Sequence, residues 1–268
     1  MIVSLISANP TSSDQVLEQF VISQVFAFLL IFFRLGAAVM VLPGVGEAYV
    51  PPRVRLGFAL GFSLALTPVL QSSLPSIPGS PLSLMLLILN EVMIGVFMGL
   101  IVRIMFAAMH ITGMILAMVS GLSSALMFDT TQSSQGSIIG NFLSIVALVL
   151  FFSMDLHHIV FKGLLDSYTL FIPGQFLPVD DFANMASRLV SKIFLIAVQL
   201  STPLLMVGLI VYLASGILSR LMPIMPVFFV IIAPQLLISF FLLMITLSAM
   251  MLWYMTTLQE TLNGFIAP

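Results

Sequence analysis

Six long apolar segments constrain the fold of this chain more than any other feature. They cover residues 20–42, 56–74, 90–110, 138–160, 193–218 and 227–252. A helix needs roughly 20 apolar residues to cross the hydrocarbon core of a bilayer. Only 7% of the residues are charged, whereas soluble domains average about 25%, and the mean hydropathy is +1.23. We therefore predict an all-α polytopic integral membrane protein, with some helices broken by Gly or Pro, as one membrane-embedded domain over residues 1–268.

Charge and residue usage exclude several classes of function. The net charge of −2 provides no basic surface for nucleic acid. The absence of cysteine excludes disulfides, thiolate catalysis and cysteine-bound metals. No phosphate-binding loop, nucleotide fingerprint or paired-carboxylate motif occurs, and residues 1–15 lack the positive start of a signal peptide. We predict no cofactor, no metal site and no enzymatic activity.

The third apolar segment carries a polar and small-residue stripe. Every fourth residue belongs to it: Glu91, Gly95, Gly99 and Arg103. Such positions share one helix face, and a GxxxG spacing allows another backbone to approach closely. We predict that this stripe packs against a neighbouring helix or subunit. The same packing role is predicted for the other GxxxG pairs and for one arginine in a turn: Gly57, Gly61, Gly136, Gly140 and Arg220.

Two interpretations of the charged residues within these segments remain open. Glu91 could carry protons, since intramembrane acids are costly and often functional. Alternatively, it could form an inter-helix or inter-subunit hydrogen bond or ion pair, which the scarcity of other intramembrane acids favours. Arg34 and Arg103 lie near segment ends and could extend to the membrane surface.

The apolar stretch that follows, 111–136, is poorly suited to a spanning helix. It is interrupted by Gly113 and Gly121 and contains several serines. Non-helical backbone at membrane depth is tolerated where protein buries it or a cavity adjoins it. We predict an ordered loop near 113–128, packed inside an assembly beside a passage.

The positive residues predict a topology. At or after the ends of the first, third and fifth segments lie Arg53, Arg55, Arg103 and Arg220, and cytoplasmic links are enriched in Lys and Arg. This places those links in the cytoplasm and both termini outside. Three further residues favour the opposite orientation: Lys162, Arg188 and Lys192.

Catalysis has one weak sequence signal. Ser123 follows Gly121 as in the GxS of intramembrane serine proteases, and His157 or His158 could serve as the base. A nucleophile needs its base within hydrogen-bonding reach, and nothing in the spacing brings these residues together. The histidines also do not make metal spacing with the carboxylates.

The order of these features resembles the FliR-type export-gate subunit of flagellar and other type III secretion systems. The matching positions span nearly the whole chain: Arg34, Pro43, Pro51 to Arg55, Glu91, Gly95, Gly99, Gly113, Gly121 to Asp129, His157 or His158, Pro173, Gly174, Pro203, Gly216 to Pro223, and Phe228. Two features depart from the family pattern. Ile224 follows Pro223 where members often have Gln, and the sequence SMDLHH replaces the more usual Gly-Gly-His.

The resemblance implies a core component of an export gate in the bacterial inner membrane, with a single copy of this subunit in each complex. Its implied partners are FliP-type and FliQ-type subunits, FlhB-type and FlhA-type components of the apparatus, and unfolded export substrates, with the complex raised toward the periplasm. Residues 1–190 would resemble the P-type subunit and 191–268 the Q-type subunit. The family's pore plug corresponds to the stretch with Gly113, Met114, Met118, Gly121, Leu122, Ser123, Met127 and Phe128. An ion-coupled secondary transporter is the alternative, and the serine protease a remote one.

Overall fold

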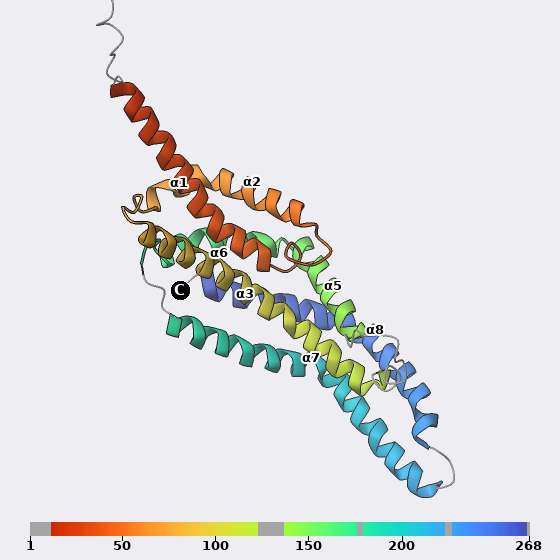
Figure 1. The fold of residues 1–268 in the computed structure, drawn as a ribbon. Helices are drawn as coiled ribbons and strands as arrows, with labels where there is room; N and C mark the ends of the chain where they lie inside the picture. The colour runs from red at the N-terminus through yellow and green to blue at the C-terminus, as the bar shows by residue number, and fades with distance from the viewer. Residues whose placement is uncertain (1–11, 123–136, 176–178, 223–226, 267–268) are drawn as a thin grey trace, which may run out of the picture. The chain divides into compact units, whose positions relative to one another are not determined.

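A computed structural model describes residues 12–122, 137–175, 179–222 and 227–266. These residues form helices and contain no strand, which confirms the predicted all-α class. The elements, shown in Figure 1, are α1 (Ser12–Val41), α2 (Pro52–Leu70), the short 3₁₀ helix η2 (Gln71–Ser73), α3 (Pro81–Val119), α5 (Ile138–Ser153), α6 (Leu156–Leu170), α7 (Val179–Leu221) and α8 (Val227–Ile266).

The helix lengths confirm a polytopic membrane protein. Five helices among the described residues are long and apolar enough to span a membrane, and α5 with α6 would supply a sixth as one bent span. Three prolines, Pro68, Pro203 and Pro234, lie inside α2, α7 and α8 respectively. Neighbouring groups in membrane proteins can satisfy the backbone that such prolines free.

The fourth apolar segment differs from its interpretation as one run over 138–160. It divides into α5 and α6, which are bent by 74° relative to each other. The break falls at Asp155, whose φ of 57° is the only positive value for a non-Gly residue in the described chain. Asp can adopt this left-handed conformation at moderate cost, so a helix break arises here without glycine or proline.

Contacts divide the chain into two compact units. The first contains residues 1–100 and 162–179, and the second contains residues 101–161 and 180–268. Helices α3 and α6 each contribute to both units. The contacts do not test the predicted likeness of residues 1–190 to the P-type subunit and of residues 191–268 to the Q-type subunit. That likeness stays a prediction.

In the first unit, α1 and α2 pack together and the connection between them is held by one arginine. The guanidinium of Arg55 donates to the carbonyl oxygens of Val50 at 2.9 Å and Glu47 at 2.9 Å. Gly44 provides the positive φ, 90°, that this turn requires. The connection is therefore an ordered structure that fixes where α2 begins.

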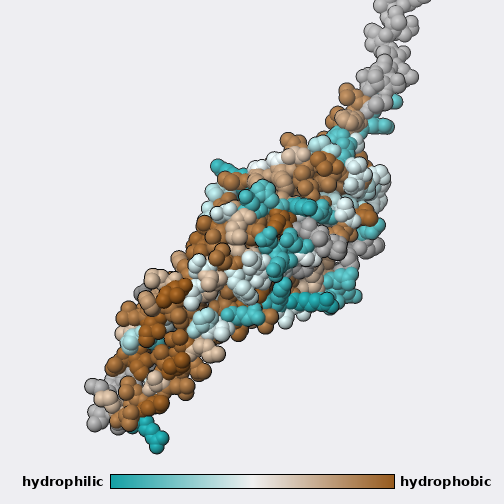
Figure 2. All heavy atoms as spheres, turned by 180° about the vertical axis from the view of Figure 1, so that it is seen from behind, coloured by the Kyte–Doolittle hydropathy of each residue, from teal (hydrophilic) through white to brown (hydrophobic). Residues whose placement is uncertain are grey.

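In the second unit, the end of α3 is surrounded by α5, α7 and α8. The hydroxyl of Tyr254 on α8 donates to the carbonyl oxygen of Met105 on α3 at 3.1 Å. Gly208 of α7 lies against Val119, where an added Cβ would overlap the valine side chain. Helices α7 and α8 run as an antiparallel hairpin (Figure 1), and Figure 2 shows hydrophobic side chains over much of its surface.

The prediction that the chain leaves the helix near Gly113 is wrong. Gly113 lies within α3, which continues to Val119. An added Cβ at Gly113 would overlap the backbone of Gly140 on α5. The glycine is explained by this close helix crossing, whose packing offsets its poor helix propensity of about 1 kcal/mol. The chain turns instead at Gly121, where φ is +77°.

Candidate functional site

The most tightly organised polar group in the first unit is centred on Arg34 of α1 and Glu91 of α3. Arg34 Nε donates to Glu91 Oε2 at 2.6 Å, and Nη2 donates to Oε1 at 3.0 Å. Both side chains are fully buried. A two-point contact of this kind combines charge with fixed geometry. The structure therefore confirms an inter-helix pairing for Glu91, with a partner in the same chain.

The remaining donors of Arg34 bind the end of α6. Nη1 donates to the carbonyl oxygen of Ser167 at 3.0 Å, and Nη2 donates to that of Phe171 at 3.0 Å. The Ser167 carbonyl oxygen also accepts the backbone N–H of Phe171 at 2.9 Å, and carbonyl groups at a helix C-terminus attract cations. The guanidinium also lies 4.0 Å from the centroid of the Tyr168 ring. Arg34 thus joins three helical segments of the first unit.

Two glycines allow α1 and α3 to come this close. A Cβ on Gly95 would overlap the carbonyl oxygen of Arg34, and one on Gly99 would lie 2.7 Å from the carbonyl oxygen of Ala38. Real side chains do not occupy such positions without backbone movement. The first three members of the predicted stripe therefore pack against α1 of the same chain.

The fourth member of the stripe behaves differently. Arg103 is exposed and belongs to the second unit. Its predicted packing with another subunit stays a prediction, as does that of Arg220, which is exposed in the last turn of α7. The interpretation that Arg34 extends to the membrane surface is wrong, because its side chain is fully buried in the ion pair.

The predicted plug residues fall into three groups. Gly113, Met114 and Met118 lie on α3, where Met114 is 41% exposed and Met118 is 69% exposed. Gly121 and Leu122 follow the end of α3, and the side-chain amide of Gln235 on α8 donates to the carbonyl oxygen of Val119 nearby. Ser123, Met127 and Phe128 lie outside the described residues.

The other predicted packing glycines also have different surroundings. An added Cβ on Gly57 or Gly61 of α2 would meet nothing within 4 Å. Gly140 lies at the crossing of α5 with α3, 2.9 Å from the carbonyl oxygen of His110 when a Cβ is built on it. Gly136 lies outside the described residues. Among the described members of the predicted glycine pairs, Gly57 and Gly61 alone leave an open small-residue surface.

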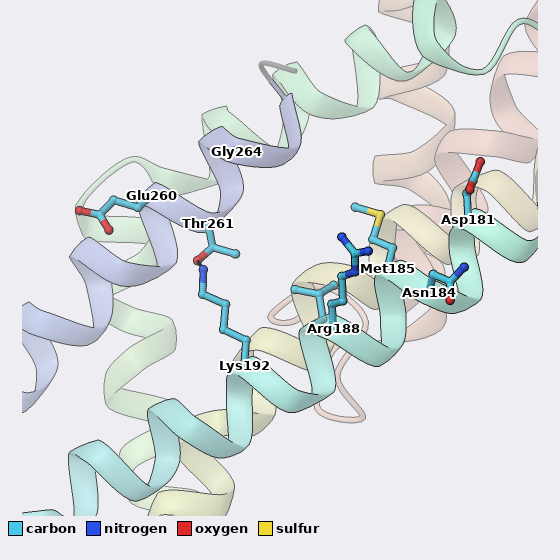
Figure 3. Close-up of a pocket in the computed structure, with 9 residues that line it drawn as sticks. Asp181, Asn184, Met185, Arg188, Lys192, Glu260, Thr261 and Gly264 are labelled. Atoms are coloured by element: carbon cyan, nitrogen blue, oxygen red, sulfur yellow. Dashed lines mark hydrogen bonds between the residues drawn. The ribbon is translucent and has the colours of Figure 1, made fainter.

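A second polar feature lies in the second unit, between the start of α7 and the end of α8. It is a cleft of about 490 Å³ lined by Asp181, Asn184, Met185, Arg188, Leu189, Lys192, Glu260, Thr261 and Gly264. Figure 3 shows the Lys192 side chain reaching across it toward Thr261, and its ammonium donates to the Thr261 hydroxyl at 2.8 Å. Sequence reasoning noticed Arg188 and Lys192 only as topology signals. Their convergence with residues about 70 positions later depends on the hairpin.

The histidines do not form a described catalytic pair. The predicted nucleophile, Ser123, lies outside the described residues. The structure does gather Asp155, His157 and His158, each offering a ligand atom within 4.8 Å of the others. The sequence interpretation found no metal spacing here, because adjacent side chains on a regular helix face different directions and the break at Asp155 carries no sequence signal.

Long apolar helices, an internally neutralised ion pair and close glycine crossings define a polytopic helical membrane protein. Residues 25–261 match the family described as "Bacterial export proteins, family 1". The chain is 33% identical to flagellar biosynthetic protein FliR of Caulobacter vibrioides, covering 90% of this chain and 96% of the relative. It is 32% identical to the Bacillus subtilis protein of that name (83% and 86% covered) and 29% identical to the Escherichia coli one (73% and 74% covered). The chain therefore belongs to the bacterial export proteins of family 1, as a FliR-type member.

Proposed function

We propose that this chain is a core subunit of the flagellar type III export gate. Family membership over residues 25–261 and relatives named flagellar biosynthetic protein FliR support this proposal. In the proposed complex, the chain assembles with P-type and Q-type subunits in the bacterial inner membrane. It also contacts the FlhB-type and FlhA-type components of the apparatus. Unfolded export substrates pass through the channel that these subunits enclose.

The observation that carries the proposal is the open small-residue surface on α2. Gly57 and Gly61 are separated by one helical turn, and neither has an atom within 4 Å of an added Cβ. The apolar side chains of Phe58 and Leu64 beside them are 39% and 65% exposed. Small residues let a second helix approach closely and gain van der Waals contacts. This surface suits a helix of a partner subunit, in contrast to the occupied surface at Gly95 and Gly99.

The α7–α8 hairpin is the second surface proposed to meet a partner. Several of its apolar side chains are more than half exposed: Met206, Leu209, Ile210, Leu213, Ile217, Leu237, Phe241 and Met244. In a helical assembly, such a hairpin packs beside hairpins of Q-type subunits, which agrees with the likeness proposed for 191–268. Arg220 at its turn provides a cation at the end of α7, where the helix carbonyl groups favour it.

The pore plug is proposed for the segment that follows α3. Met114 and Met118 present flexible apolar side chains on the last turns of α3, and methionine adapts readily to changing neighbours. Apolar constrictions block ions by excluding water. In this proposal, the two methionines and the residues through Phe128 close the channel until a substrate opens it.

The proposed role is structural rather than enzymatic. Arg34 and Glu91 neutralise each other inside the first unit, so this pair is a poor binding site for a solute or a travelling proton. A secondary transporter would instead carry a midplane substrate site between structural repeats. The two classes differ in what the isolated chain can do: a transporter binds its solute without partners, whereas a gate subunit works only inside its complex.

The proposal is tested by purification and complementation. The full chain, carrying an affinity tag, is expressed with P-type and Q-type subunits and extracted in mild detergent. We expect one stable complex of the three proteins, and restored motility in a flagellate strain that lacks its own subunit. Purification of the chain as a stable monomer that takes up a small solute in vesicles would contradict the proposal and support the transporter.

A further inference from the structure

The bend between α5 and α6 gathers three side chains that commonly bind transition metals. Asp155 occupies the break, and His157 and His158 lie in the first turn of α6. One ligand atom from each residue lies within 4.8 Å of the others. Two imidazoles and one carboxylate are a frequent protein ligand set for Zn²⁺, which leaves a fourth position for water.

Asp155 and His158 lie within ion-pair distance, and their separation also suits two ligands of one metal ion. Asp155 Oδ1 and His158 Nδ1 are 3.6 Å apart, which is beyond a good hydrogen bond. Ligand bonds of about 2.0–2.2 Å at a tetrahedral angle place two donor atoms about 3.3–3.5 Å apart. A small side-chain rotation from the observed geometry therefore brings both atoms onto one ion.

The backbone conformation of Asp155 turns the chain at the bend, and its carboxylate stays accessible there. Its φ of 57° places a non-Gly residue in the left-handed region, which residues other than Gly, Asn and Asp rarely adopt. The backbone N–H of His158 donates to the Asp155 carbonyl oxygen at 3.0 Å, so the first turn of α6 begins at Asp155. The carboxylate is 76% exposed and lies next to His158, which is 70% exposed.

The third member is held in place by aromatic rings. His157 lies 5.3 Å from Phe152 and 6.0 Å from Phe161, measured between ring centroids. Its ring is also 4.2 Å from that of His158. The buried Nδ1 of His157 has no hydrogen-bond partner among the described residues. An imidazole whose ring orientation is fixed by its neighbours needs little rearrangement to bind a metal ion.

We propose that Asp155, His157 and His158 form a binding site for a Zn²⁺-class divalent transition-metal ion at the α5–α6 bend. The site has one open coordination position, which water or a carboxylate from a neighbouring subunit can fill. The carboxylate is essential, because the positive end of α6 opposes a cation and Asp155 offsets that field. This site is independent of the gate function proposed above.

The test uses the full chain within its detergent-solubilised membrane complex, purified with a tag that contains no histidines and freed of metal by a chelator. Zn²⁺ is titrated by calorimetry, and Co²⁺ replaces it to report tetrahedral geometry through its visible absorption. Asp155→Gly removes the ligand while placing the most permissive residue at the positive φ, so folding is expected to be preserved. His158→Gln removes a second ligand, and Asp180→Asn is the control carboxylate, exposed at the start of α7.

We expect one Zn²⁺ per chain in the unmodified protein and in Asp180→Asn. Asp155→Gly and His158→Gln should each weaken binding by roughly tenfold or more, since even groups outside the ligand set alter affinity by 10–100-fold. The proposal is overturned if the unmodified protein shows no saturable Zn²⁺ binding. It is equally overturned if either variant binds Zn²⁺ as the unmodified protein does.

Discussion

Arg34 and Glu91 lie 57 positions apart in the chain and form a two-point ion pair that is completely shielded from solvent. Burying two charges is costly, and their attraction compensates only when the geometry is good and the other donors are satisfied. Both conditions are met, because the remaining N–H groups of the Arg34 guanidinium donate to the carbonyl oxygens of Ser167 and Phe171. The pair therefore specifies how α1, α3 and α6 meet more than it adds stability.

The first prediction concerns the loss of one partner. Glu91→Leu leaves the buried Arg34 without its counter-charge, and breaking a buried pair in this way costs about 3–5 kcal/mol. We expect a strongly lowered thermal unfolding midpoint in detergent and a poor yield of the assembled complex. Both are measured on chains expressed at equal levels.

A double variant separates charge from shape in this network. Arg34→Leu together with Glu91→Leu removes both charges, so the combined loss should be smaller than the sum of the two single losses. Recovery will be incomplete because the carbonyl groups of Ser167 and Phe171 lose the hydrogen bonds that Arg34 donates. Simple additivity of the two single effects would show that the charges are not coupled.

The second prediction compares glycines on two helices. Gly95→Leu and Gly99→Leu force side chains into the backbone of α1, and overpacking alone typically costs 1–3 kcal/mol. We expect these variants to be unstable as single chains, before any partner binds. Protease resistance of the chain expressed without the other subunits measures this effect.

Gly57→Leu is the matched variant on the open surface of α2. No atom within the chain lies within 4 Å of an added Cβ at Gly57, so the single chain should resist protease normally. If a partner helix packs there, the variant should nevertheless fail to enter the complex in mild detergent. Normal assembly of Gly57→Leu would mean that this surface faces lipid.

The sequence predicted the helices well because membrane-length apolar runs leave the backbone few alternatives. It also identified Glu91 as a residue that needs a partner. It could not select Arg34 as that partner, since a long side chain near a segment end can equally extend to the surface. The choice depends on the close crossing at Gly95, which is visible only once α1 and α3 are placed together.

The wrong prediction at Gly113 and the missed break at Asp155 have a common physical cause. Local propensity disfavours glycine within a helix and gives no strong reason to bend one at aspartate. In the structure, a tertiary contact with Gly140 keeps Gly113 helical, while Asp155 adopts the left-handed conformation that glycine usually occupies. The helical course at Gly113 depends on a packing partner distant in sequence, and the break at Asp155 depends on a single backbone angle. The periodicity of apolar residues reports neither of these.

The third prediction addresses catalysis. Ser123→Ala should leave motility and secretion close to normal, because a structural subunit needs no nucleophile at this position. Export of flagellar substrates into the medium is measured in a strain that depends on the variant. An assembled Ser123→Ala complex that exports nothing would revive the protease alternative.

The last prediction concerns the plug, and the helical course of α3 determines how it must be tested. A deletion that begins at Met114 would remove Leu116 and Ala117, which are 0% and 3% exposed and belong to the core of the second unit.

Deleting residues 123–128 leaves α3 and Leu122 intact. Met118→Ser is its companion, since that side chain is 69% exposed on α3 and the change removes apolar bulk from a proposed seal. If these residues close the channel by excluding water, both variants should assemble normally but leak ions, the deletion more than the substitution. Ile145→Ser provides the control, because it changes an apolar side chain of similar exposure, 61%, on α5, outside the proposed seal and the proposed partner surfaces. Conductance of the purified complexes in planar bilayers measures the leak, and a deletion complex as tight as the unmodified one would place the seal in the partner subunits.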